Sequence, residues 1–151
     1  MASRRGVGWV FNWMTRRTAA SYGLIGEAIM LLHEQRLGLD GRALFNAVAA
    51  SRYLRVVLVA LRPDLRDDDV ALADLGARHR PRLQFGGRSR VGYIGDVLRC
   101  ATRESAKVRR LLRCVGERKG PVGRVYDEVA VHLAEARTAL EGAPAARSVL
   151  N

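Results

Sequence analysis

Three histidines, His33, His79 and His132, are the first side chains in this 151-residue chain to consider for chemistry. A zinc site draws Cys or His ligands from close intervals, and none of the three histidines has a second Cys or His at such a spacing. The glycine-rich phosphate-binding motifs and the GxSxG motif of serine hydrolases do not occur either. We therefore expect a protein that is not an enzyme and that holds neither a metal ion nor a cofactor.

Two cysteines, Cys100 and Cys114, are the next candidates. Each follows an arginine, and a neighbouring cation lowers the pKa of a thiol. No candidate base lies nearby in the sequence, however. The two residues lie fourteen positions apart on one expected helix, about 21 Å along its axis, which is too far for a disulfide. We interpret both as buried structural cysteines, in keeping with an intracellular protein.

A run of three aspartates, Asp67–Asp69, is a candidate metal or phosphate site. Acidic residues are also favoured at the first turn of a helix, where they oppose the positive end of its dipole. We prefer this second interpretation and expect Asp67 or Asp68 to cap a short helix. Gly76 would then end that helix in the left-handed conformation.

Apolar residues recur at helical spacing along almost the whole chain, which predicts an all-α fold in a single compact bundle. About seven helices are expected, at 9–17, 22–36, 41–50 (capped by Asp40), 53–62, 67–75, 91–116 and 121–140. The β-branched segment 53–61 is also compatible with a buried strand. Residues 82–90, which contain a Gly-Gly pair, would form either a short basic hairpin or a loop.

Composition and length bound the domain organisation. The chain is 48% hydrophobic and 27% charged, as in ordinary globular domains. We expect one domain at 9–140, a flexible basic N-terminus at 1–8 and a flexible tail at 141–151. No uninterrupted apolar run approaches the roughly 18 residues of a membrane span, and the N-terminal segment lacks the apolar core of a signal peptide. These patterns predict an intracellular, cytoplasmic protein without a membrane span.

The net charge of +11 comes from 24 arginines and only two lysines. Such an excess of arginine is typical of a GC-rich genome, so part of the charge reflects coding bias. Residues 78–113 nevertheless hold eleven basic and two acidic side chains, a net charge of +9. One interpretation of this segment is a nucleic-acid-binding face, for which a nuclear location is expected. The other is that its cations lie on the solvated side of an amphipathic helix. The candidate phosphate contacts are Arg78, Arg80, Arg82, Arg88, Arg90, Arg99, Arg103, Lys107 and Arg110.

Several short segments resemble the Bcl family of helical bundles, and especially its divergent poxvirus members. VFNWMTRR (10–17) and IMLLHE (29–34) are similar to the first two helices of the viral proteins. FGGRSRVGYIGDVLRCA (85–101) resembles the family's first homology motif, with Gly92 and Ile94 at its Gly and Ile. Gly120, before the last helix, resembles the second motif. Val91 departs from the pattern, since the family has a Trp there.

The resemblance implies a protein that binds other proteins. In apoptosis regulators of this family an apolar groove receives the amphipathic helix of a partner, here a host protein. Arg88 or Arg90 would pair with an Asp of that helix. The groove walls would come from Leu44, Phe45, Val48, Tyr53, Leu54 and Val97.

Other viral members of the family block signalling proteins through surface contacts or dimer faces. Trp9 and Trp13 are candidates for such a contact, with a homodimer as one form of it, or they pack into the core. The leading hypothesis is a Bcl-like viral modulator of host apoptosis or innate immune signalling. The alternatives are a basic helical nucleic-acid-binding protein and a structural subunit of a virion or phage.

Overall fold

A computed structural model describes the backbone of residues 2–34, 41–117 and 119–150, and the side chains of 8–34, 41–117 and 119–142. Over these ranges the chain is helical and contains no strand, so the all-α prediction is confirmed. The elements are α1 (Ala2–Glu34), α2 (Arg42–Leu61), the short 3-10 helix η1 (Pro63–Leu65), α3 (Asp69–His79), α4 (Arg90–Cys114) and α5 (Pro121–Leu150).

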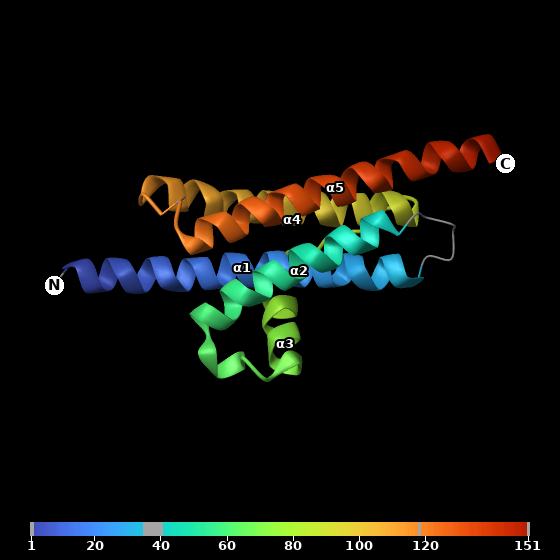
Figure 1. Ribbon diagram of the computed structural model, residues 1–151. Coiled ribbons are helices and arrows are strands. Elements are labelled where there is room, and N and C mark those ends of the chain that lie inside the picture. The colour runs from blue at the N-terminus through green and yellow to red at the C-terminus, as the bar shows by residue number, and fades with distance from the viewer. Residues whose placement is uncertain (1, 35–40, 118, 151) are drawn as a thin grey trace.

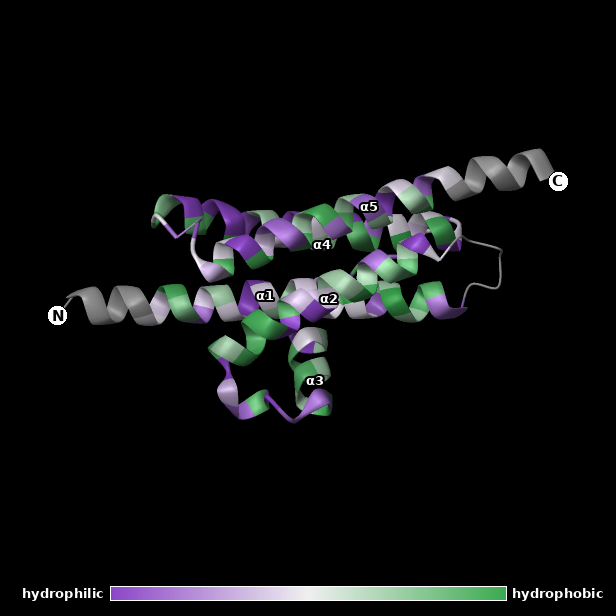
Figure 2. Ribbon diagram, viewed as in Figure 1, coloured by the Kyte–Doolittle hydropathy of each residue, from purple (hydrophilic) through white to green (hydrophobic). Residues whose placement is uncertain are grey.

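Four long helices form an antiparallel bundle, and α3 lies outside it across α1 (Figure 1). α1 contacts α2 and α4, and α5 contacts the same two helices from the other side. Each long helix therefore runs antiparallel to both of its neighbours (Figure 1). Polar and apolar bands alternate along the helices, as expected when one side of each faces the core (Figure 2).

The described residues form five α-helices, which corrects the expected seven. α1 includes the two helices predicted at 9–17 and 22–36, and α2 includes those at 41–50 and 53–62. The residues that join each pair include no proline or glycine, so nothing in the backbone interrupts the helix. Segment 53–61 is therefore helical. α1 and α5 also continue through 2–8 and 141–150, and Asp40 lies outside the described residues.

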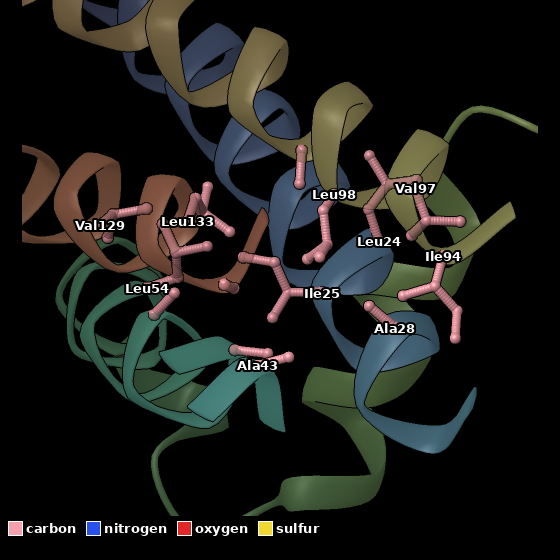
Figure 3. Packing of buried hydrophobic residues seen from close by; sticks show 14 of the residues in the cluster. Leu24, Ile25, Ala28, Ala43, Leu54, Ile94, Val97, Leu98, Val129 and Leu133 are labelled. Atoms are coloured by element: carbon pink, nitrogen blue, oxygen red, sulfur yellow. The ribbon is translucent and has the colours of Figure 1, made fainter. Parts of the chain in front are cut away.

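Apolar side chains from all four long helices meet in one core (Figure 3). Leu24 and Ile25 of α1 lie at its centre, where they face α2, α4 and α5. Burial of each such side chain stabilises the fold by about 1.5–3 kcal/mol relative to its exposure. A smaller cluster anchors α3 and η1 to the bundle and consists of Ala19, Leu58, Leu65, Leu72 and Leu75.

Two glycines allow α3 to lie directly on α1. A Cβ atom added to Gly23 would lie 2.2 Å from the carbonyl oxygen of Gly76, so only a hydrogen fits between the two backbones. Gly76 is thus a contact residue inside α3, and the prediction that it ends the helix was wrong. Asp68 caps α3 as expected, since its carboxylate accepts a hydrogen bond from the backbone N–H of Ala71 at 2.9 Å.

Segment 80–89 is a loop, and the hairpin alternative does not form. Gly86 and Gly87 turn the chain there with positive φ values of 57° and 75°. Such values are readily adopted by glycine. Ser89 then caps α4 by accepting a hydrogen bond from the backbone N–H of Gly92 at 3.1 Å.

The core also contains polar side chains, and two pairs of hydroxyl groups are hydrogen-bonded to each other there. The hydroxyl groups of Thr18 and Tyr126 share a hydrogen bond between α1 and α5, and both residues are fully buried. Ser21 and Ser105 are hydrogen-bonded at 2.7 Å between α1 and α4. Because a buried hydroxyl without a partner is costly, these pairs favour one alignment of the helices over others.

Candidate functional site

α2 is apolar on two faces, and only one of them is used by the bundle. The inward face carries the buried residues Ala43, Asn46, Ala47, Ala50, Leu54, Val57 and Leu58. A second stripe at three- and four-residue steps points outward and consists of Gly41, Leu44, Phe45, Val48, Ala49, Arg52, Tyr53 and Val56. We call this stripe the outer α2 face. Phe45 is 68% exposed and Val56 is 61% exposed, so the described residues leave the face largely uncovered.

The outer α2 face is hollowed into a groove of about 710 Å³, to which α5 contributes His132. The Nδ1–H of His132 donates a hydrogen bond to the Oδ1 of Asn46 at 2.8 Å. The imidazole ring also stacks on Tyr53, with 5.7 Å between ring centroids and 23° between planes. The neighbouring helix α5 therefore restrains the orientation of the Tyr53 ring.

Because α2 is apolar on two faces, its composition as well as its length suits a membrane-crossing helix, and no other helix in the described residues meets both criteria. The core helix of a soluble protein passes the same test, so length and composition are weak support for a span. Arg52 and Arg55 lie within the helix, and its inward face packs against α1 and α5. These features favour a bundle helix with an exposed apolar side.

The structure brings together four of the predicted groove residues and separates the other two. The four that line the groove are Leu44, Phe45, Val48 and Tyr53. Leu54 and Val97 are buried in the core, on the inward faces of α2 and α4 (Figure 3). They are not available to a partner.

The two arginines predicted to pair with a partner lie outside the groove and form ion pairs within the protein. Arg88 forms an ion pair with Asp96 of α4, and Arg90 lies 3.5 Å from the carboxylate of Glu34 at the end of α1. The cation that lies in the groove is Arg52, which has no ion pair with any residue in the described part of the chain.

Sequence reasoning missed Arg52, Val56 and His132. The continuous three- and four-residue spacing from Gly41 to Val56 would have identified the first two.

The two tryptophans of α1 differ in their surroundings. Trp9 is 60% exposed, whereas Trp13 is half-buried and packs against the core. The guanidinium group of Arg17 lies 5.5 Å from the centroid of the Trp13 ring, within the range of a cation–π contact. Trp13 therefore packs against the core, as one of the two alternatives predicted, whereas Trp9 lies on the surface and stays a candidate interface residue.

Most of the predicted basic face is paired within the protein. Ion pairs join Arg80 to Glu27, Arg88 and Arg99 to Asp96, Arg90 to Glu34, and Lys107 to Glu104. Arg78, Arg82, Arg103 and Arg110 form no ion pair with a described residue. A cation that is already neutralised by a carboxylate gains less from a phosphate. This face is therefore weaker as a nucleic-acid site than its net charge suggests.

The two cysteines differ in their surroundings: Cys100 is half-buried, whereas Cys114 is exposed, so the interpretation of both as buried cysteines was wrong for Cys114. Burial, followed by the nearby carboxylate of Glu104, raises the pKa of the Cys100 thiol, which opposes formation of the nucleophilic thiolate. The Glu104 side chain is itself buried and is bound by Arg17 at 2.9 Å and by Lys107 at 3.2 Å. No group of three or more His, Cys, Asp or Glu residues in these ranges is arranged to hold a metal ion.

No protein-family model matches the chain, and no curated protein and no solved structure matches it either. The Bcl-like resemblance therefore stays a prediction based on short motifs. The outer α2 face combines exposed apolar side chains with a wall that is ordered by the stacking of Tyr53 on His132, so it is the candidate binding surface of the bundle.

Proposed function

We propose that the protein is a non-enzymatic interaction module that binds an apolar helix of a partner protein on the outer α2 face. The exposure of Phe45 and Val56 on a continuous apolar stripe is the observation that carries the proposal. Contiguous exposed apolar surface is characteristic of binding sites, and interface cores are enriched in aromatic residues and arginine. The outer α2 face combines both, with Phe45 and Tyr53 beside Arg52.

A helix is the partner element that fits this groove. The stripe spans about 22 Å from Gly41 to Val56, or four helical turns. An amphipathic helix with apolar anchors at i, i+3, i+4 and i+7 presents a stripe of the same spacing. Arg52 would pair with an acidic residue of that helix, and the stacked Tyr53 would offer a wall whose conformational entropy is already reduced.

The Bcl-like resemblance supports a narrower form of the proposal. The partner would then be a host regulator of cell death or innate immune signalling, met in the cytoplasm of an infected cell. The partner's helix would occupy the outer α2 face. The role that the family gives to a basic residue would fall to Arg52, because Arg88 and Arg90 are paired within the chain.

The test is fluorescence anisotropy of a labelled amphipathic peptide with four leucine anchors at i, i+3, i+4 and i+7 and one aspartate placed to face Arg52. We expect Leu44→Arg and Phe45→Arg to weaken binding at least about tenfold, or about 1.4 kcal/mol. The matched control is Arg103→Glu combined with Arg110→Glu, which changes two exposed cations without an ion pair and should leave peptide binding unchanged. The opposite pattern, with binding lost only in the control, would contradict the proposal.

A further inference from the structure

We infer that α2 of a second copy of this chain can occupy the outer α2 face, so that the protein forms a symmetric homodimer with the two α2 helices antiparallel. This inference rests on the proposed function, because it names the partner of that same face. A symmetric dimer requires one surface patch to complement itself across a twofold axis, with every contact made twice. The outer α2 face meets that requirement.

The axis that fits lies between Val48 and Ala49. An antiparallel helix placed across it brings Val48 opposite Ala49 of the second copy, and Gly41 opposite Val56. Each branched side chain thus faces a small residue, which lets two helices approach to the 8–10 Å typical of helix packing. The same axis brings Leu44 opposite Tyr53, so the two large apolar groups cover one another.

The only charged residue of the outer α2 face finds a suitable contact in this arrangement. Arg52 lies opposite Phe45 of the second copy, and a guanidinium group stacks favourably on the face of an aromatic ring. Phe45 is among the most exposed of the large apolar side chains in the described residues, so its ring is accessible. The two Arg52 side chains belong to contacts about 10 Å apart along the helix, a distance at which salt screens their repulsion.

The expected dimer is weak. Each copy offers four turns of one helix, so the contact is close to the roughly 1,000 Å² of total buried area that a specific interface needs. Because so small a contact must offset the loss of translational and rotational freedom on association, we expect a dimer that forms in the micromolar range and dissociates on dilution. Such a dimer would cover the face at high concentration and leave it free for another helix at low concentration.

Sedimentation equilibrium over a range of protein concentrations tests the inference. We expect a monomer–dimer equilibrium for the unmodified protein. Phe45→Arg places two arginines opposite each other, and Arg52→Glu places a carboxylate over the Phe45 ring. Each change should raise the dissociation constant at least about tenfold. Val70→Arg, at an exposed valine on α3, is the matched control and should not change it.

The double variant Phe45→Arg with Arg52→Glu tests the antiparallel register itself. It places an arginine opposite a glutamate at both contacts, so dimerisation should recover to within about threefold of the unmodified protein. A protein that stays monomeric, or a dimer that neither single variant weakens, would refute the inference, and so would a double variant that fails to recover. A monomer that binds the amphipathic peptide through Phe45 would refute the homodimer and leave the proposed function standing. A monomer that does not bind the peptide would refute both.

Discussion

Replacing Gly23 with alanine should push α3 away from α1, whereas replacing Gly26 with alanine should stabilise α1. The Cβ atom of an alanine at position 23 would lie 2.2 Å from the carbonyl oxygen of Gly76 and 2.4 Å from its carbonyl carbon. Both atoms belong to the backbone, so no side-chain rotation relieves the clash. The two helices must separate. Gly26 lies one turn further along α1, and a Cβ atom there meets no heavy atom within 4 Å.

The size of the effect follows from what α3 and η1 bury. Leu65, Leu72 and Leu75 pack with Ala19 and Leu58, and each leucine stabilises the fold by about 1.5–3 kcal/mol. Complete loss of this cluster would therefore cost about 5–9 kcal/mol. A partial separation is the cheaper response, and we expect Gly23→Ala to cost at least about 3 kcal/mol, above the usual range for an overpacked side chain. Gly26→Ala should gain about 0.5–1 kcal/mol, because alanine restricts the unfolded chain and favours the helix.

Urea denaturation followed by circular dichroism measures both changes, with the protein concentration held constant so that association contributes equally. Amide hydrogen exchange of α3 locates the effect, since exchange should accelerate there first in Gly23→Ala. A Gly23→Ala protein as stable as the unmodified one would refute the close contact of α1 and α3. The same sign of change in both variants would refute the assignment of the clash to Gly23.

Three further predictions concern buried and half-buried polar groups. Tyr126→Phe should cost about 1–3 kcal/mol in urea denaturation, because it leaves the fully buried hydroxyl of Thr18 without a partner. Adding Thr18→Val should recover most of that loss, and a double variant no more stable than Tyr126→Phe would contradict the pairing. Burial and then the neighbouring arginines lower the pKa of His79, so the folded state prefers the neutral ring. The free energy of unfolding should therefore fall as pH decreases from about 7 to 5, and His79→Gln should reduce this slope, whereas an unchanged slope would contradict the assignment. Arg17→Ala should destabilise the fold by about 1–3 kcal/mol, since the buried Glu104 loses one of its two cations, and Arg17→Lys should lose less.

The fold was largely predictable, and the excess of predicted helices has a physical reason. The amphipathic pattern of α4 and the break at Gly116–Pro121 are strong signals, and both agree with the structure. The excess of predicted helices arose at 18–21 and 51–52, where polar residues interrupt the apolar pattern of the sequence. The buried stripes nevertheless continue through both places, with Thr18 and Ser21 buried in line with Ile25 of α1, and Ala50 in line with Leu54 of α2. Thr18 and Ser21 are hydrogen-bonded to other helices in the core, and only the tertiary arrangement separates such a buried polar residue from a turn.

The candidate site was predictable in part. Leu44, Phe45 and Val48 were correctly grouped, because their spacing places them on one side of a helix. Leu54 was grouped with them because α2 is apolar on both faces, and periodicity does not tell an exposed apolar face from a buried one. The pairing of Arg90 with Glu34 joins residues that lie 56 positions apart, and no local pattern predicts such a contact.

The measurement that tests the central claim most directly is a methyl NMR titration of the protein with the amphipathic peptide. Leu44, Val48 and Val56 should shift on binding, whereas the exposed valines Val70 and Val131 should not, because they lie outside the outer α2 face. A parallel titration with duplex DNA serves as the comparison. If the outer-face methyl groups stay unchanged with the peptide while residues of 78–113 respond to DNA with a strong salt dependence, the proposed role of the outer α2 face is contradicted.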